Sequence, residues 1–516
     1  MISACLRLER STQAILLVCL AGAIASAFVA CSSSPRPSIA ADGGADASPD
    51  GRTGGELLAE LPCSDALDSI YADPGDVGGA PKGAILKCAR GPDIARADLL
   101  AAAAAPYQAG APGYSGKPFT SGAHVYHVLY RTERGDPANT PGYSSALVLL
   151  PDTPRASRSP VVVASHGSRG QAAKCAPSRI DLAQPTDLDT GFLQQVYPLV
   201  GHGYAVIAPD LAGYANYGGA HNPPSAYADA ADVGKSTLDG ARALRRLLPS
   251  HLTEQVVLVG HSQGGHTALS ALALADQYGA DGVIAAVAVY APLWWSQHAW
   301  GALFLKPSAY GFAESSGGFV SIWYHYTHAE LLDGPGHGVD LFALDKQAAI
   351  RSFVENDCWS SSYPDLQTLG NSANDFFVPS YTDVVSIAAT PNASCNGDVT
   401  CQKWIDRMTA DWPHLQKASS VPMLVLYANG DTTITPDLAA CVFKRLRDDQ
   451  TAAKVCYDPD PVGHAGIVSA KADYVADWIG AQVLGEPAPA DCPLDDTALK
   501  DNSGAPVACN PLLPNE

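Results

Sequence analysis

The sequence predicts an α/β protein in which helices cover both faces of a mostly parallel, doubly wound sheet, with a mainly helical segment inserted late in the chain. Three observations predict this class. From about residue 124 onward, short apolar runs alternate with amphipathic helical stretches. Several of these runs are apolar throughout, as strands covered on both faces are. The alternation then stops between residues 292 and 413, a segment that holds seven of the eight tryptophans.

The apolar runs are the expected strands. The first two would form a hairpin, and the later ones are separated by helices expected at 230–248 and 265–278. The expected strands are 124–131, 145–150, 160–164, 204–208, 255–259, 283–290, 421–427 and 454–457.

Composition and charge restrict the class of protein. The 516 residues are 47% hydrophobic and 16% charged, which is enough apolar material for a large core and excludes a disordered chain. The formal net charge of -20 has the wrong sign for attraction to phosphate backbones or anionic headgroups. Nucleic-acid binding is therefore disfavoured.

The N-terminus has the layout of an export signal. Arg7 and Arg10 precede an uncharged run at 14–30, which is short for a membrane-spanning helix. Cys31 follows directly, and the whole resembles a bacterial lipoprotein signal in which this cysteine is lipidated and becomes the mature N-terminus. Cleavage near residues 25–27 by an ordinary signal peptidase and a retained anchor are the alternatives. We expect an exported bacterial protein, at the outer membrane or cell surface if lipidated and otherwise secreted.

Composition shifts divide the chain into six expected segments. Residues after the signal are mostly Ser, Pro, Ala, Gly and Asp, which predicts a tether. The aromatic-rich insert would lie at the carboxyl edge of the sheet, where open α/β sheets bind ligands. The segments are the signal (1–30), the tether (31–56), the sheet domain (57–291), the helical cap (292–413), the rest of the sheet domain (414–485) and a disulfide-pinned tail (486–516).

The cysteines support export. Setting aside Cys5, Cys19 and Cys31, ten cysteines remain, and an even number in an exported chain indicates disulfides. No C-x-x-C spacing occurs, so no zinc site is expected. Proximity in sequence suggests three pairs, Cys395 with Cys401, Cys63 with Cys88 and Cys492 with Cys509.

The strongest local motif is G-x-S-x-G at Gly260 to Gly264, which stands between an apolar strand at 256–259 and a helix. Such a turn forces the serine into a strained conformation and exposes its hydroxyl above the sheet. Side chains at Gly260 and Gly264 would clash with the neighbouring strand and helix. Ser262 is therefore the candidate nucleophile.

A serine nucleophile needs a base and an orienting acid. Asp431 is the carboxylate at the end of a late strand, with Asp437 as the fallback, and His464 is the last histidine in the chain and follows the next strand. The small residues around His464 predict a loop packed against the nucleophile turn. His261 and His266, which are close to Ser262 in sequence, are interpreted as packing or substrate-side residues.

Backbone N–H groups would stabilise a tetrahedral oxyanion. One belongs to Gln263, the residue after the nucleophile, at a helix N-terminus. The second is expected from Ser168, or alternatively Gly167, in a loop that follows a strand and reads H-G-x-x-G. Asp210 is expected to fix its own loop and to take no part in chemistry.

These motifs resemble those of the α/β-hydrolase superfamily over about residues 57 to 485, and within it those of the secretory lipase family. The matching features are the stretch from Gly203 to Tyr214, the motif Gly260-His261-Ser262-Gln263-Gly264-Gly265, the helical insert, and the late Asp431 and His464. The resemblance implies hydrolysis of fatty-acid esters, with the insert serving as cap and acyl-chain site.

The sequence thus predicts an exported serine carboxylic-ester hydrolase that works through Ser262, His464 and Asp431 on a small-molecule or lipid ester. No metal or organic cofactor is expected, and the membrane is a partner only through a lipid anchor. The alternatives are an exported aminopeptidase or prolyl-type peptidase on the same fold, and a catalytically silent surface-binding module.

Overall fold

The computed structural model describes most of the chain after residue 60. The described residues are 61–107, 111–214, 222–305, 316–359, 366, 369–370, 372–390, 393–415, 420–490, 492–495, 499 and 505–509. The chain divides into two units, Met1–Gly51 and Arg52–Glu516, and every described residue belongs to the second. The predicted signal, Cys31 and the tether lie outside the described residues. Among the helices that can be described, none has both the length and the hydropathy needed to cross a membrane.

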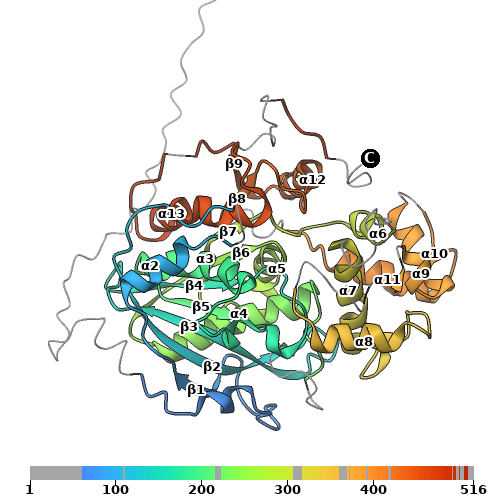
Figure 1. Cartoon of the computed structure of the whole chain (residues 1–516), viewed down its shortest axis with the longest axis horizontal. Helices are drawn as coiled ribbons and strands as arrows, with labels where there is room; N and C mark the ends of the chain where they lie inside the picture. The colour runs from blue at the N-terminus through green and yellow to red at the C-terminus, as the bar shows by residue number, and fades with distance from the viewer. Residues whose placement is uncertain are drawn as a thin grey trace, which may run out of the picture. The chain divides into compact units, whose positions relative to one another are not determined.

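A single sheet runs through the domain and confirms the predicted fold class. Its nine described strands follow the order β1-β2-β3-β5-β4-β6-β7-β8-β9 (Figure 1). The pairs β1–β2, β2–β3 and β3–β5 are antiparallel, and every pair from β5 through β9 is parallel. The strands are β1 (Ile85–Arg90), β2 (Ala123–Glu133), β3 (Pro141–Pro151), β4 (Ser159–Ser165), β5 (Val206–Pro209), β6 (Leu252–His261), β7 (Val283–Tyr290), β8 (Pro422–Ala428) and β9 (Ala452–Asp458).

All eight predicted strands are present, and the predicted hairpin is formed by β2 and β3. Strand β1 was not predicted. It is an edge strand whose sequence, Ile85-Leu-Lys-Cys-Ala-Arg90, is interrupted by Lys87 and has only two buried residues, so it lacks the apolar run of the central strands.

Helices cover both faces of the sheet. In β6, Val256 and Leu258 pack in one apolar cluster with α4 (Ala230–Leu247), α5 (Gln263–Tyr278) and α12 (Pro436–Asp448). The alternate residues Val257 and Val259 pack in a second cluster with α2 (Arg96–Ala104), α3 (Asp187–Gly201) and α13 (Gly463–Val483). This period of two places successive side chains on opposite faces, as a doubly wound sheet requires.

The insert between β7 and β8 is mainly helical and shares the first apolar cluster with the sheet domain. Its large side chains Trp300, Trp323 and Trp404 are fully buried. Figure 1 shows the insert, coloured yellow to orange, grouped beside the sheet domain. Its elements are α6 (Gln297–Leu305), α7 (Ser316–Leu332), η5 (His337–Val339), α8 (Gln347–Asn356), α9 (Ala373–Phe376), α10 (Pro379–Ala389) and α11 (Val399–Ala410).

The ten cysteines expected to pair form five disulfides, which fits an exported protein. The predicted pairs Cys63–Cys88 and Cys395–Cys401 are correct. The predicted pair Cys492–Cys509 is wrong, because the tail runs along the domain. Cys492 bonds to Cys456 in β9, beside a bridge between Val455 and Asp495, and Cys509 bonds to Cys441 in α12. The remaining disulfide joins Cys175 to Cys358.

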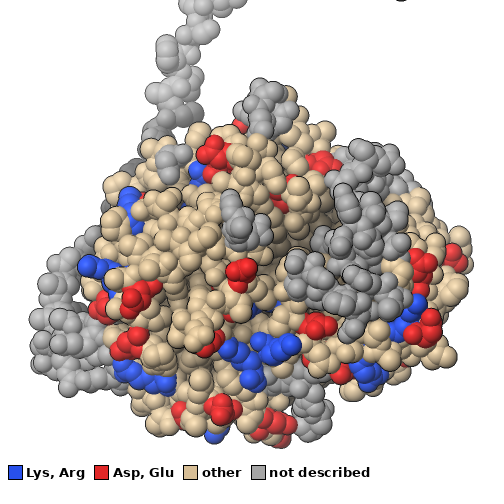
Figure 2. All heavy atoms as spheres, viewed as in Figure 1, with Lys and Arg blue, Asp and Glu red and all other residues tan. Residues whose placement is uncertain are grey.

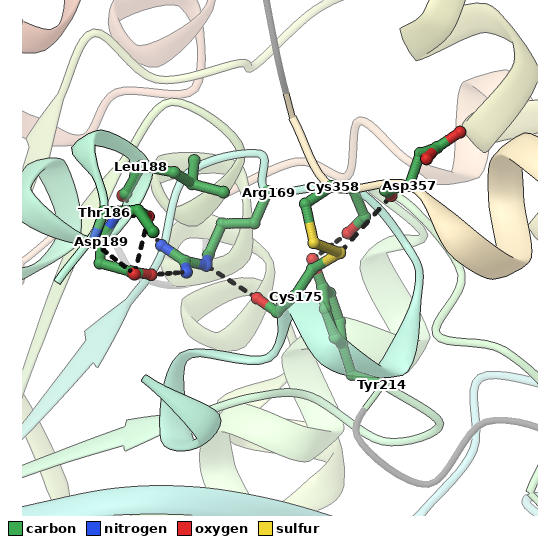
Figure 3. Close-up of a disulfide and its surroundings, with 9 residues drawn as sticks. Arg169, Cys175, Thr186, Leu188, Asp189, Tyr214, Asp357 and Cys358 are labelled. Carbon is green, nitrogen blue, oxygen red and sulfur yellow. Dashed lines mark hydrogen bonds and ion pairs between the residues drawn. A yellow bond between two sulfur atoms is a disulfide. The ribbon is translucent and has the colours of Figure 1, made fainter. Parts of the chain in front are cut away.

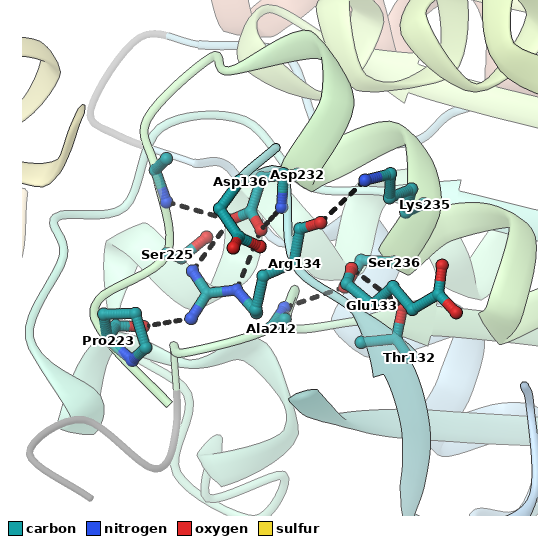
Figure 4. Close-up of polar contacts among 12 residues, drawn as sticks. Thr132, Glu133, Arg134, Asp136, Ala212, Pro223, Ser225, Asp232, Lys235 and Ser236 are labelled. Atoms are coloured by element: carbon teal, nitrogen blue, oxygen red, sulfur yellow. Dashed lines mark hydrogen bonds and ion pairs between the residues drawn. The ribbon is translucent and has the colours of Figure 1, made fainter. Parts of the chain in front are cut away.

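A buried arginine fixes the segment that leads into α4. Arg134, which follows β2 and is inaccessible to solvent, donates from Nε and Nη2 to the Asp232 carboxylate at 2.8 and 2.9 Å (Figure 4). It also donates to the carbonyls of Pro223 and Pro224, at 2.5 and 2.9 Å. Lys235 Nζ in turn donates to the Arg134 carbonyl at 2.7 Å. The backbone just before α4 is therefore held by charge-assisted hydrogen bonds inside the protein.

Candidate active site

Ser262 lies in the sharp turn between β6 and α5 with φ 55° and ψ -117°, a left-handed conformation that is strained for a residue with a side chain. The surrounding glycines leave no space for a Cβ. A Cβ on Gly260 would lie 2.0 Å from the Gly264 carbonyl oxygen, and one on Gly264 would lie 2.0 Å from the Ser165 carbonyl oxygen in β4. The turn therefore holds the serine hydroxyl at the carboxyl edge of the sheet.

Asp431 and His464 are hydrogen-bonded to each other. Asp431 follows β8, and its Oδ2 lies 2.8 Å from Nδ1 of His464. Its other oxygen, Oδ1, accepts from the backbone N–H groups of Thr433 and Ile434, both at 2.8 Å. With Nδ1–H donating to the carboxylate, the lone pair of the imidazole is at Nε2.

The carboxylate is stabilised in its charged form. Burial raises the pKa of Asp431, but the facing His464 and the two backbone N–H groups outweigh burial and lower this pKa overall. A charged carboxylate at this position orients the imidazole and stabilises its protonated form.

Two details around the pair differ from the sequence prediction. His464 is not in a loop, because α13 begins at Gly463 and makes it the second helical residue. The fallback acid Asp437 lies in the first turn of α12, and the hydrogen bond to His464 comes from Asp431 instead.

Ser262 and His464 line one cavity of about 120 Å³ at this edge of the sheet. Side chains of the insert form much of its apolar wall, namely Leu293, Trp295, Leu303, Val320 and Trp359. Phe192 and Leu188 of α3 line another side. The aromatic-rich insert therefore supplies an apolar lining directly beside the serine.

Of the two candidate oxyanion donors, Ser168 lines the same cavity, and Gln263 directly follows Ser262 in the chain. Gln263 is the first residue of α5, and Ser168 follows β4. In the part of the chain that is described, neither backbone N–H donates to a protein acceptor. A Cβ on Gly167 would lie 3.1 Å from His261 Nδ1, so the loop packs closely against the nucleophile turn. The hydroxyl of Ser168 is hydrogen-bonded to the Tyr227 hydroxyl at 2.6 Å, a partner that sequence reasoning missed.

Arg169 anchors the loop that follows β4 and contains Ser168. Its guanidinium pairs with Asp189 at 2.5 Å and donates to the carbonyls of Cys175 and Leu188 at 2.8 and 3.0 Å (Figure 3). In addition, the backbone N–H of Trp359, in the insert, donates to the Arg169 carbonyl at 2.8 Å. The disulfide from Cys175 to Cys358 crosses the same junction. The loop is therefore fixed to both α3 and the insert.

The neighbouring histidines have separate environments. His261 lines the cavity, and burial lowers its pKa to about 3, so the ring is neutral. Its Nε2–H donates to the His464 carbonyl at 3.0 Å. His266 is buried on α5 and donates to the Asp411 carbonyl at 2.8 Å, away from the cavity.

Asp210 lies outside the cavity and holds a loop. Its carboxylate accepts from the Ser145 hydroxyl at 2.5 Å and from the Ser178 N–H at 2.7 Å. The Ser178 hydroxyl is a further donor.

One group of potential metal ligands occurs in the described part of the chain: Asp229, His328 and Asp411, all buried, with candidate ligand atoms within 4.8 Å of one another. Each of the three side chains has a hydrogen-bond partner within the protein. His328 Nε2 donates to the Tyr227 carbonyl at 3.1 Å, and Asp411 accepts from the Tyr324 hydroxyl at 2.6 Å. Asp229 accepts from the Asp232 N–H at 2.8 Å. We interpret the group as a polar joint between the insert and α4.

Comparison with known proteins supports the predicted fold. The model of the alpha/beta hydrolase family matches residues 189–478, more than half of the chain. Candida antarctica lipase A in its closed state is similar in structure with a TM-score of 0.57 and 16% identity, covering 85% of this chain and 88% of the lipase. The rice cell wall degrading esterase LipA from Xanthomonas oryzae has a TM-score of 0.57 and 17% identity, covering 78% of this chain and 99% of the esterase. No curated protein matches the sequence significantly. The family match and the shared architecture together show that the chain belongs to the alpha/beta hydrolase family.

Proposed function

We propose that this hydrolase is an exported serine carboxylic-ester hydrolase, a lipase or esterase that works through an acyl-enzyme. The observation that carries the proposal is that Ser262, in its strained turn, and His464, bonded to Asp431, line the same apolar cavity. That a structurally similar protein is a lipase and another an esterase agrees with this reaction class.

The geometry supports a two-step acyl transfer. Ser262 Oγ attacks the ester carbonyl while its proton passes to Nε2 of His464, and Asp431 stabilises the imidazolium that forms. The backbone N–H groups of Gln263 and Ser168 stabilise the negative oxygen of the tetrahedral intermediate. The imidazolium then protonates the leaving alcohol, and water attacks the acyl-enzyme by the same route. No step requires a metal or an organic cofactor.

We also propose a preference for short acyl chains, because the cavity that the described residues line is small. An apolar cavity of about 150 Å³ holds a benzene ring, and the cavity here measures about 120 Å³. We expect kcat/KM to be highest for butyrate to hexanoate esters and to fall for longer chains. A p-nitrophenyl ester series from acetate to palmitate measures this preference.

The variant Ser262→Ala tests the proposal. We expect kcat for p-nitrophenyl butyrate to fall by about 10⁴ or more, because loss of the nucleophile leaves only oxyanion stabilisation and binding. A fluorophosphonate probe should label the parent protein and not the variant. Ser386→Ala, an exposed position on α10, is the matched control and should retain activity. Hydrolysis retained by Ser262→Ala would contradict the proposal, and absence of labelling in the parent would favour the silent binding module.

The peptidase alternative requires a residue in the site that an ester hydrolase does not need. An aminopeptidase needs a carboxylate to hold the substrate amine, and none of the described residues that line the cavity is acidic. Parallel assays with tributyrin and an aminoacyl-naphthylamide separate the two activities. We expect hydrolysis of tributyrin only.

We also propose export with lipidation at Cys31. Incorporation of labelled palmitate that Cys31→Ser abolishes would support the anchor, and a soluble, unlabelled product would favour plain secretion.

Acidic and basic side chains are scattered over the face shown in Figure 2, and most of its described area is uncharged. We propose no nucleic-acid partner.

A further inference from the structure

The hydroxyl groups of Ser168 and Tyr227 form an isolated pair at the cavity. Their oxygens are 2.6 Å apart, and both residues line the cavity with Ser262. Two hydroxyls carry two protons, and the hydrogen bond between them uses one. In the described part of the chain, neither oxygen has another side-chain or backbone partner. One hydroxyl proton is therefore left beside the nucleophile.

The chemistry of the pair indicates which proton is left. Burial raises the pKa of Tyr227 well above its ordinary value, so the phenol stays protonated. A phenol is a better hydrogen-bond donor than an aliphatic alcohol, because it is the stronger acid. Tyr227 therefore donates to Ser168 Oγ, and the proton of Ser168 is free. This proton belongs to the residue whose backbone N–H is the candidate oxyanion donor.

Helix α7 of the insert fixes the backbone of Tyr227. The Tyr227 N–H donates to Oγ1 of Thr327 at 2.9 Å, and its carbonyl accepts from Nε2 of His328 at 3.1 Å. Its ring packs against Trp323 of the same helix with centroids 5.8 Å apart.

The preceding segment is fixed as well. Arg134 holds the carbonyl of Pro223 (Figure 4) and that of Pro224, and Gln171 Nε2 donates to the Ser225 carbonyl at 2.7 Å. Tyr227 is itself only 1% exposed. Its hydroxyl is thus presented to Ser168 from a rigid support that includes the insert.

We propose that Tyr227 is a positioning residue, which holds the Ser168 hydroxyl so that its proton donates to the oxyanion as a third hydrogen bond, and that helix α7 holds Tyr227 in turn. This inference rests on the proposed function, since it assigns a role within the same ester-hydrolysing site. It gives the insert a part in transition-state stabilisation besides lining the acyl pocket.

We expect Ser168→Ala to lower kcat more than Tyr227→Phe does. Loss of one full oxyanion donor costs about 10²–10³ in kcat. Because the two backbone donors remain, we expect Ser168→Ala to lower kcat about 30-fold and Tyr227→Phe, which keeps the ring, about 10-fold. KM should change little in either variant, because the bond forms in the transition state.

The test is a double-mutant cycle with p-nitrophenyl butyrate. If Tyr227 acts through Ser168, the double variant should lose no more activity than Ser168→Ala alone. Ser168→Thr, which keeps a hydroxyl, should recover most of the activity. The inhibition constant of a trifluoromethyl ketone, which forms a tetrahedral adduct with the serine, should rise by the same factor as kcat falls. Tyr130→Phe is the matched control, since the Tyr130 hydroxyl donates to the Ser236 carbonyl outside the cavity.

Several results would overturn the inference. These are additive losses in the double variant, a parent-like kcat in Tyr227→Phe, or a rise in KM with kcat unchanged. If Tyr227→Phe does not fold, Thr327→Val removes the anchor of the Tyr227 N–H instead, and a parent-like kcat there would count against the inference. An inactive Ser262→Ala with a parent-like Tyr227→Phe would refute this inference alone, whereas an active Ser262→Ala would refute the proposed function.

Discussion

His261 and His464 lie ring beside ring with centroids 4.7 Å apart, and the His261 imidazole donates from Nε2 to the His464 main-chain carbonyl at 3.0 Å. The bond ties the residue before the nucleophile to the first turn of α13. Burial keeps the His261 ring neutral, and the carbonyl acceptor places its single N–H at Nε2. We interpret this contact as fixing the distance between the turn that holds Ser262 and the proposed base, His464.

The first prediction concerns this contact. His261→Phe keeps a ring but removes the N–H, and we expect kcat to fall about 10-fold, because small displacements of a catalytic group are costly. His261→Gln keeps an N–H donor and should lose less. Steady-state kinetics with p-nitrophenyl butyrate measure both. Equal losses in the two variants would show that ring packing, not the hydrogen bond, is what matters.

The second prediction separates the two candidate acids. Asp431→Asn should lower kcat by about 10³–10⁴, because the amide favours the wrong imidazole tautomer and cannot stabilise the imidazolium. KM should stay within about twofold, since the acid acts on the transition state. Asp437→Asn is the matched control and should retain activity. A large loss in the control and a small loss at Asp431 would reverse the assignment.

The third prediction concerns the pH dependence of stability at the buried polar group of Asp229, His328 and Asp411. Burial, with a further contribution from Asp232, raises the pKa of Asp229 to about 7. The folded protein therefore binds this proton more tightly than the unfolded chain, whose aspartates have a pKa of about 3.9. The protonated Asp229 carboxyl makes its full contribution to the free energy of unfolding below about pH 4. This contribution is lost as the pH rises through about 7.

The variant Asp229→Asn mimics the protonated acid and keeps a cap acceptor for α4. In thermal unfolding we expect it to be more stable than the parent at pH 8, and the difference to disappear toward pH 4, with a slope on the order of 1 kcal/mol per pH unit. Asp229→Ala, which loses the cap, should be less stable than Asp229→Asn at every pH. A difference between Asp229→Asn and the parent that is independent of pH would contradict the prediction.

The fourth prediction compares two disulfides. The Cys175–Cys358 bond closes a sequence separation of 183 residues, and the Cys395–Cys401 bond closes one of 6. Chain-entropy arguments give a stabilisation of about 5 kcal/mol for the long loop and about 2 kcal/mol for the short one. Replacing both cysteines of each pair with serine should lower the melting temperature more for the long loop.

Loss of the long-range bond should also lower kcat, because Cys175 and Cys358 flank the contacts of Arg169, which is next to the proposed oxyanion donor Ser168. The Cys395/Cys401 double variant should keep the parent kcat. Equal effects of the two pairs on kcat would indicate that the long-range bond does not support the site.

The sequence predicted the elements that local patterns determine. Strand β6 and the turn after it could be recognised because apolar β-branched residues lead into glycines that the turn requires, and Asp431 because it directly follows β8. The start of α13 was missed because Gly463 and Gly466, which lie in its first turn, have low helix propensity. Strand β1 was missed because it lies at the edge of the sheet and needs no apolar run.

Contacts between distant segments were beyond sequence reasoning. Cys492 and Cys509 were paired because they are close in the chain, but the tail lies along β9 and α12, and each cysteine bonds to the element beside it. Tyr227 carries no local signal, since it reaches Ser168 only after the insert and the segment before α4 pack together. Likewise, nothing in the sequence around Arg169 indicates that it will form an ion pair with Asp189.

The order of the disulfides along the chain also has a consequence for oxidative folding. If the chain is exported from its N-terminus, as we propose, Cys63 and Cys88 emerge first, and Cys175 is followed by its partner Cys358 with no other cysteine between them. An oxidase that joins cysteines in their order of appearance would form these two bonds correctly, but it would join Cys441 to Cys456, which instead bond to Cys509 and Cys492. Correct pairing at the end of the chain would then call for a thiol–disulfide isomerase in the receiving compartment.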